Sequence, residues 1–222
     1  MTVPHIVLAS NSPRRSEILG WTKLPFSVHP ADINETPLEN EPADEYVLRL
    51  ANNKAQASAG FAPFNGIVLA ADTTVADGNT LMGKPVDSED ARRMLIRLRG
   101  KIHQVHSAVV VSVPSKGIKK EVICSTDVHM RRYTDDEIDV YLSTGDPIDK
   151  AGAYAIQHPG FRPVIKFAGC FASVMGLPLC HFEYMLRQMG FGERREIPHV
   201  CQEKLSYSCP IYQHVLKGEI VG

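Results

Sequence analysis

The chain has 222 residues, of which 44% are hydrophobic, and its formal net charge is −1. This length and composition suit an α/β domain with a substantial core and argue against a disordered chain. The near-neutral charge argues against a general nucleic-acid-binding surface, although it leaves room for a local basic pocket. No apolar run reaches the roughly 18 residues that a membrane span needs.

The N-terminal sequence MTVPHIVLAS lacks the basic region and the long apolar stretch of a secretory signal. The five cysteines match no zinc or redox spacing, and no Cys–His or Ser–His–Asp arrangement can be read from the scattered histidines. We therefore expect a reduced cytoplasmic protein with no membrane and no nucleic-acid partner.

The first hundred residues alternate predicted strands and helices. The apolar run 5–10 predicts a short buried strand, and Ser12-Pro13 predicts the start of a helix that ends at Gly20. The 3.6-residue period predicts helices over 44–60 and 88–100. A continuous apolar run predicts a buried strand over 66–77.

The rest of the chain is predicted to be richer in antiparallel β structure. The pattern predicts strands over 103–113, 120–133, 153–157 and 162–174, a helix over 134–145, and a last helix from Pro178 to Gly190. Thr134 and Glu137 have the spacing of a capping box. We therefore expect an α/β fold with a long mixed sheet flanked by helices, in a domain over 1–192 with a C-terminal extension over 193–222.

Two arginines stand in the first turn of the first predicted helix. A helix N-terminus carries partial positive charge, so Arg14 and Arg15 are unfavourably placed there unless an anion binds. The hydroxyls of Ser10 and Ser12 would add donors to such a site. The spacing alone leaves two interpretations open, a phosphate clamp or a pair of solvated arginines.

Two lysines are candidate partners of that anion. Lys54 lies on the apolar stripe of its helix, where it either extends past the core to solvent, the more common case, or points into a cleft. Lys84 follows Gly83 and precedes Pro85 in a predicted loop that is not a P-loop, and an ordinary turn is the alternative.

Two carboxylates are candidate metal ligands or bases. Asp72 follows a buried apolar run directly, near the predicted end of a strand, and needs a partner or a capping role. Glu35 lies in a proline-flanked stretch with no evident structural task. With Asp149, Lys150 and Gln157, whose amide can both donate and accept, the set has the composition of a nucleotide-phosphate site with a divalent metal.

Six motifs occur in order along the chain: LASNSPRR, NKA, AADTTV, GKP, DKAGAYAIQ and SVMGLP. Together they resemble the Maf family of nucleoside triphosphate pyrophosphatases over about residues 5–192. The resemblance implies hydrolysis between the α and β phosphates with a divalent cation, Mg²⁺ or Mn²⁺. It also implies a fold like that of the inosine triphosphate pyrophosphatases, with two lobes around a cleft, and it is compatible with a homodimer.

The resemblance also implies roles for individual residues. Asp72 would act as general base, as metal ligand or as both, and Glu35 would share the metal. The phosphates would be bound by the set Ser10, Arg14, Arg15, Lys54 and Lys84. Thr73 and Gln157 would read the edge of a pyrimidine base or shape its pocket.

Three positions divide the family by substrate. The branch acting on dTTP and UTP carries the residues found here, namely Arg14, Thr73 and Gln157. The branch acting on 7-methyl-GTP usually carries tryptophan, glutamine and glutamate there. One departure is that the usual GIQG segment reads AIQH, with Ala155 and His158. The alternatives are a 7-methyl-GTP or inosine triphosphate pyrophosphatase, or a nucleotide-binding regulator of septum formation.

Overall fold

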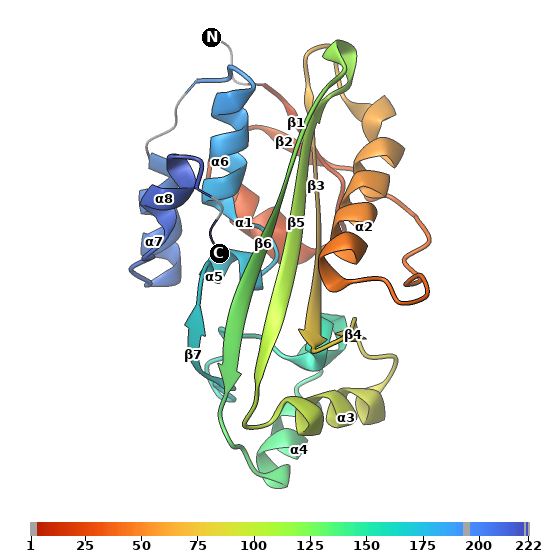
Figure 1. The fold of residues 1–222 in the computed structure, drawn as a ribbon, viewed down its shortest axis with the longest axis vertical. Helices are drawn as coiled ribbons and strands as arrows, with labels where there is room; N and C mark the ends of the chain where they lie inside the picture. The colour runs from red at the N-terminus through yellow and green to blue at the C-terminus, as the bar shows by residue number, and fades with distance from the viewer. Residues whose placement is uncertain (1–3, 193–195, 220, 222) are drawn as a thin grey trace.

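The computed structural model describes residues 4–192, 196–219 and 221 (Figure 1). Its strands are β1 (Ile6–Leu8), β2 (Phe26–Val28), β3 (Ile67–Asp77), β4 (Thr80–Met82), β5 (Ile102–Val113), β6 (Ile118–Met130) and β7 (Val164–Ala168). Its helices are α1 (Pro13–Gly20), α2 (Ala43–Ala57), α3 (Ser88–Leu98), α4 (Asp135–Ser143), α5 (Phe171–Val174), α6 (Leu179–Gln188), α7 (Glu196–Leu205) and α8 (Tyr212–Leu216). Among these residues, no helix has both the length and the apolar composition needed to cross a membrane.

The strands form one seven-stranded mixed sheet in the order β2-β1-β3-β5-β6-β7, with β4 paired to β3. Strand β1 pairs in parallel with β2 and β3. Strands β3, β5, β6 and β7 pair antiparallel in succession. The predicted α/β class with a mixed sheet flanked by helices is therefore confirmed.

Strand β3 is apolar over most of its length because helices cover both of its faces. Side chains of a strand alternate between faces, so Ile67 and Leu69 pack with α1, α5, α6 and α7, while Val68 and Ala70 pack with α2. Figure 1 shows α2 on one side of the sheet and α6, α7 and α8 on the other. One strand thus belongs to two separate cores.

A third core lies at the far end of the sheet, where α3 and α4 pack (Figure 1). It contains Val75 of β3, Val105 of β5 and Val128 of β6, together with Leu95 and Tyr141 from the two helices. Strands β3, β5 and β6 therefore run through both ends of the molecule, which gives the expected two lobes on one continuous sheet.

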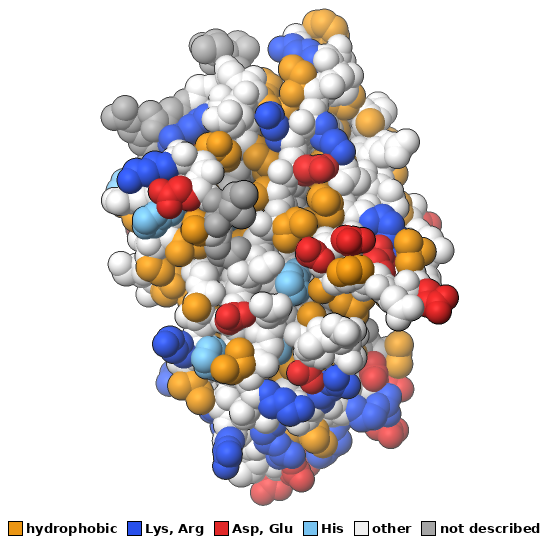
Figure 2. Space-filling view, in the orientation of Figure 1, with side chains coloured by type: hydrophobic (Ala, Val, Ile, Leu, Met, Phe, Trp, Pro, Cys, Tyr) orange, Lys and Arg blue, Asp and Glu red, His pale blue; other side chains and the backbone are white. Residues whose placement is uncertain are grey.

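The arginines of α3 and its C-terminal cap do not form an unpaired basic patch. Each one pairs with a carboxylate: Arg92 with Asp139, Arg93 with Glu89 and Asp90, Arg97 with Asp77, and Arg99 with Asp135. Figure 2 shows blue and red side chains side by side over the lower end of the molecule. These arginines belong to a solvated, ion-paired surface.

Two predicted strands differ from the structure. Residues 153–157 form no strand, because Gly152 and Ala153 have φ of +68° and +60°, which no extended strand allows. Only Val164–Ala168 of the predicted strand 162–174 is β structure. Gly169 then turns the chain at φ +135°, and α5 follows.

Helix ends were predicted with mixed success. The capping box of Thr134 and Glu137 at the start of α4 is confirmed. Ser12 stands at the N-cap position of α1, but its hydroxyl makes no capping hydrogen bond. The helix from Pro178 is not the last, because α7 and α8 follow it and pack against α6, burying Ile197 and Val215. The division of the chain at residue 192 stays a prediction.

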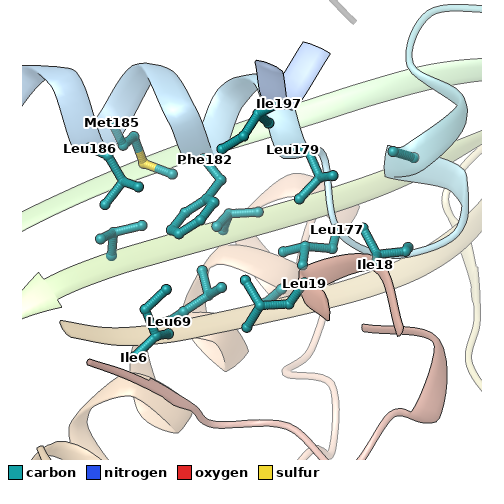
Figure 3. Close-up of a cluster of buried hydrophobic side chains, with 14 of the residues drawn as sticks. Ile6, Ile18, Leu19, Leu69, Leu177, Leu179, Phe182, Met185, Leu186 and Ile197 are labelled. Carbon is teal, nitrogen blue, oxygen red and sulfur yellow. The ribbon is translucent and has the colours of Figure 1, made fainter. Parts of the chain in front are cut away.

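Phe182 of α6 is fully buried at the centre of the core that joins the sheet to α1 and α7 (Figure 3). We expect Phe182→Ala to lower the free energy of unfolding by about 3–5 kcal/mol, because it removes a large apolar side chain and leaves a cavity. Urea denaturation measures the change. Phe64→Ala is the matched control, since Phe64 is 85% exposed, and it should change stability by no more than about 0.5 kcal/mol. Equal effects of both variants would contradict this assignment.

Candidate functional site

A cavity of about 420 Å³ lies beside the middle of β3. Strand β1 pairs with β3 only as far as Leu8 opposite Leu69, and β4 begins to pair at Val75. Within the described part of the chain, no strand pairs with the edge of β3 between these points, and the chain after β1 turns away into α1. The cavity therefore opens at the carboxyl end of a parallel strand, where open α/β sheets commonly bind ligands.

All nine residues predicted for the site line this one cavity: Ser10, Arg14, Arg15, Glu35, Lys54, Asp72, Thr73, Lys84 and Gln157. They come from α1, α2, β3 and four loops. The fold thus brings all nine residues to one place. What each one does chemically stays a prediction.

Lys54 points into the cavity instead of extending past the core to solvent. Its Nζ lies 2.5 Å from Oδ1 of Asp72 and 2.6 Å from Oε1 of Glu35, and the residue is only 8% exposed. Helix α2 packs on β3, so the buried stripe of the helix carries Lys54 onto the strand. A buried ammonium needs such anionic partners, which resolves the alternatives for this residue.

Asp72 lies in the middle of β3, opposite Ala108 of β5, and not near the strand end as the sequence suggested. A turn or capping role is therefore excluded. Its carboxylate is buried, with Lys54 as an ion-pair partner. Strand β3 continues past Asp72 to Asp77, so five strand residues follow the carboxylate.

Glu35 is held near Asp72 by its backbone, because the hydroxyl of Tyr46 donates a hydrogen bond of 2.9 Å to the Glu35 carbonyl oxygen. Its side chain is 55% exposed at the mouth of the cavity. Two carboxylates that share one ammonium leave a net charge of −1 at this point. Carboxylate oxygens are the ligands that Mg²⁺ and Mn²⁺ prefer, so the donor set fits a hard divalent cation.

Arg15 is fixed by three hydrogen bonds. Its Nε donates to the carbonyl of Gly176 at 3.0 Å, Nη1 to Oγ of Ser10 at 3.1 Å, and Nη2 to Oγ1 of Thr73 at 3.1 Å. Burial lowers the pKa of Arg15 below its usual value, and the nearby Asp72 carboxylate opposes that shift. The guanidinium keeps two N–H groups for a ligand.

The hydroxyl of Thr73 is part of a directed chain of hydrogen bonds. Ser107 donates its one proton to the carbonyl of Ser173 at 2.8 Å, so Thr73 must donate to Ser107 across 2.7 Å. Thr73 in turn accepts from Arg15. Because a hydroxyl has a single proton, Thr73 has none left for a ligand. The geometry favours a role in positioning Arg15 over direct contact with a base.

Ser10 differs from Thr73 because its hydroxyl proton is not used within the protein. Its Oγ accepts hydrogen bonds from Arg15 and from the backbone N–H of Ser12. Both contacts use lone pairs, so the hydroxyl proton is available to a ligand oxygen. Ser10 is therefore placed as a donor at the base of the cavity.

Arg14 brings a donor with no partner. Its Nε is buried and has no hydrogen-bond partner among the described residues, although a buried donor normally has one. The first turn of α1 contains no acidic residue. Unpaired donors and a helix N-terminus facing one cavity make an anion-binding surface.

Lys84 and Gln157 lie on two exposed loops that are joined to each other. The N–H of Gly152 donates to the carbonyl of Gly83 at 3.1 Å. Gly152 has φ +68°, and a Cβ there would lie 2.9 Å from Cγ2 of Val75, so the turn requires glycine. Lys150, in contrast, is buried and paired with Asp146 and Asp149, so it adds no unpaired cation to the cavity.

Sequence reasoning missed the residues that hold the site in place: Tyr46, Ser107, Ser173 and Gly176. Tyr46 offered one usable signal, because it falls on the buried stripe of α2, where a hydroxyl needs a partner. Two of the others act through backbone carbonyls, which leave no trace in a sequence.

The cavity therefore has two electrostatic parts. Carboxylates of Glu35 and Asp72 flank Lys54 on one side, while Arg14, Lys84 and the N-terminus of α1 supply donors on another. This arrangement can bind a polyphosphate together with a divalent cation. The donors would neutralise the phosphates, and the carboxylates would neutralise the cation.

Residues 5–189 match the family model described as "Maf-like protein". A dTTP/UTP pyrophosphatase of Anaeromyxobacter dehalogenans (strain 2CP-C) is 46% identical over 190 residues, 85% of this chain and 95% of that protein. A dTTP/UTP pyrophosphatase of Methylococcus capsulatus is 43% identical over 190 residues, 86% of this chain and 93% of that protein.

Among solved structures, the Ham1 protein of Staphylococcus aureus gives a TM-score of 0.43 at 17% identity, covering 91% of this chain and 98% of that chain. The HAM1 protein of Coxiella burnetii gives a TM-score of 0.40 at 18% identity, covering 59% of this chain and 74% of that chain.

The unpaired Nε of Arg14 predicts that the cavity binds polyphosphate. Arg14→Ala should weaken binding of inorganic tripolyphosphate by about 10- to 100-fold, because a hydrogen bond to a charged group contributes about 1.5–3 kcal/mol. Isothermal titration calorimetry measures the dissociation constant. Arg93→Ala is the control, because Arg93 pairs with Glu89 and Asp90 of its own helix. Unchanged binding in Arg14→Ala would remove Arg14 from the anion site.

Proposed function

The chain belongs to the Maf family, and from this premise we propose that it is a nucleoside triphosphate pyrophosphatase that hydrolyses dTTP and UTP to the monophosphate and pyrophosphate. The observation that carries the proposal is the meeting of two carboxylates, Lys54 and the donors of α1 in one cavity. The names of the relatives give the substrate class. The enzyme would clear excess or modified pyrimidine nucleotides in the cytoplasm, where five free thiols stay reduced.

Asp72 is the proposed general base. Its carboxylate would take a proton from the water that attacks the α-phosphorus, and pyrophosphate would leave. Lys54, 2.5 Å from Asp72, pairs with that carboxylate and orients it in a buried setting. An ionised, fixed carboxylate is what proton abstraction requires.

The phosphate chain would be held by the donors on the other side of the cavity. Arg14, Lys84 and the free proton of Ser10 would contact phosphate oxygens and offset the charge that develops on the leaving pyrophosphate. Arg15 keeps two N–H groups for the same task. Its three hydrogen bonds to the protein fix their direction before substrate arrives.

Glu35 and Asp72 are the proposed ligands of a divalent cation, Mg²⁺ or Mn²⁺. Such a cation supplies charge stabilisation to the phosphate oxygens. Lys54 already separates the two carboxylates and limits their mutual repulsion. The half-exposed Glu35 gives the cation access from solvent together with the nucleotide.

Gln157 is the proposed reader of the pyrimidine base. Gln157 is exposed on the loop that is joined to Gly83 by the hydrogen bond of Gly152. Its amide can both donate to and accept from the edge of a base. Thr73 acts indirectly by orienting Arg15. Specificity for dTTP and UTP would then depend on one amide and on the shape of the pocket.

Asp72→Asn should lower kcat for dTTP with Mg²⁺ by at least about 10²-fold, because the amide cannot accept the proton of water. Pyrophosphate release measures the rate. The control is Asp77→Asn, at the end of β3 and paired with Arg97 outside the cavity, and it should retain turnover. Near-normal turnover of Asp72→Asn would exclude this residue as the base.

The proposed substrate class is tested with a panel of dTTP, UTP, 7-methyl-GTP and inosine triphosphate on the unaltered enzyme. We expect the highest kcat/KM for dTTP and UTP. Gln157→Glu should lower kcat/KM for both by roughly fivefold or more, the effect of losing about 1 kcal/mol of hydrogen bonding. A preference for either purine nucleotide would support the corresponding alternative. Tight binding with no pyrophosphate release would indicate a nucleotide-binding regulator.

A further inference from the structure

A second cluster of potential ligands lies apart from the cavity, at the junction of β6, α5 and α6. Sγ of Cys124 in β6, Sγ of Cys170 at the start of α5, and a ring nitrogen of His181 in α6 lie within 4.8 Å of one another. All three residues are buried. The fold thus creates a Cys–His arrangement that the sequence spacing did not reveal. The three elements are neighbours in Figure 1.

Buried cysteines alone are ordinary small apolar residues, so the histidine decides how the cluster is interpreted. Nε2 of His181 lies 3.1 Å from the carbonyl oxygen of Val221. A carbonyl only accepts, so Nε2 carries the proton and Nδ1 carries a lone pair. Nδ1 is buried and has no hydrogen-bond partner among the described residues. The imidazole of this cluster therefore has one nitrogen that can accept a proton or bind a metal and that has no hydrogen-bond partner among the described residues.

This arrangement matches what a metal-binding histidine requires. Such a histidine usually donates its second N–H to a carbonyl or carboxylate, which fixes the tautomer and orients the ring. Most buried polar side-chain atoms have at least one hydrogen-bond partner, so the unpartnered Nδ1 of His181 calls for a ligand.

We propose that Cys124, Cys170 and His181 form a structural zinc site. Sulfur and imidazole are the ligands that Zn²⁺ prefers, whereas the oxygen donors of Glu35 and Asp72 suit Mg²⁺ or Mn²⁺. On binding, each thiol releases its proton to solvent. Two thiolates and one Zn²⁺ then sum to zero charge, which a buried site can accommodate, whereas a monovalent cation would leave a buried negative charge.

The geometry needs only a small adjustment. Zn–S bonds of about 2.3 Å and Zn–N bonds of about 2.0 Å place tetrahedral ligand atoms about 3.5–3.8 Å apart. The present separations are all within 4.8 Å, so an inward movement of about 1 Å suffices. The three residues supply three of the four tetrahedral ligands.

A zinc ion here would clamp the turn that supports the cavity. Cys170 immediately precedes α5, and α5 contains Ser173, whose carbonyl ends the hydrogen-bond chain from Arg15. Gly176, the other carbonyl partner of Arg15, follows two residues after α5. The proposed site would thus secure the turn that carries both carbonyls, from residues that do not line the cavity.

The test uses the full chain refolded from denaturant with Zn²⁺, because buried ligands acquire metal as the protein folds. Excess metal is removed by gel filtration and bound zinc is measured by mass spectrometry. The Glu35→Gln/Asp72→Asn background removes the oxygen ligands of the cavity and should retain roughly one zinc ion per chain. Adding Cys124→Ser to this background should reduce zinc to below about a tenth of an ion per chain. Cys209→Ser, the matched control, should leave it unchanged.

A spectroscopic arm covers the case in which the serine variant does not fold. X-ray absorption at the zinc edge of the unaltered protein should show two sulfur ligands and a histidine nitrogen, and Zn²⁺ should raise its melting temperature relative to chelator. The proposal is overturned by a shell of oxygen and nitrogen alone, by full zinc content in Cys124→Ser, or by a Cys124–Cys170 disulfide in the freshly purified protein. None of these readouts depends on pyrophosphatase activity, so failure of one proposal is distinguishable from failure of the other.

Discussion

The structure depends on how one strand is buried. Strand β3 is covered by helices on both faces and has strands on both edges, except beside residues 70–74. Asp72 falls in that gap, and because it is buried its carboxylate must be paired. Lys54 provides the pairing, and it can do so only if α2 packs flat on the strand. The Lys54–Asp72 ion pair therefore links three features: the packing of α2 on β3, the buried charge of Asp72 and the cavity beside it.

Most of the fold was predictable because its elements have clear periods and end signals. The capping box at Thr134 and the apolar run of β3 are examples. The strand predicted over 153–157 failed because Gly152 and Ala153 adopt positive φ under tertiary packing against Val75. The local sequence, with its alanine and tyrosine, favours a strand. The contact with Val75, which is distant in the sequence, does not appear in that pattern.

The candidate site was predictable to a different depth. Charged residues in unusual positions, such as Lys54 on an apolar stripe, could be recognised as candidates from the sequence. The ordered motifs indicated the other site residues. The hydrogen bond from Arg15 to Gly176 joins residues 161 positions apart through a backbone oxygen, so no side-chain pattern encodes it. Cys124, Cys170 and His181 sit on three elements with irregular spacing, and only the fold brings them together.

The hydrogen-bond chain from Arg15 through Thr73 and Ser107 to Ser173 has a consequence for how such proteins diversify. Its protons all run in one direction, so a side chain at position 73 must accept from Arg15 and donate to Ser107 at the same time. The effect of a substitution at Thr73 is therefore expected to depend on Arg15 and Ser107, its hydrogen-bond partners. We expect a lineage that loses either hydrogen bond of this position to need compensating substitutions at its partners.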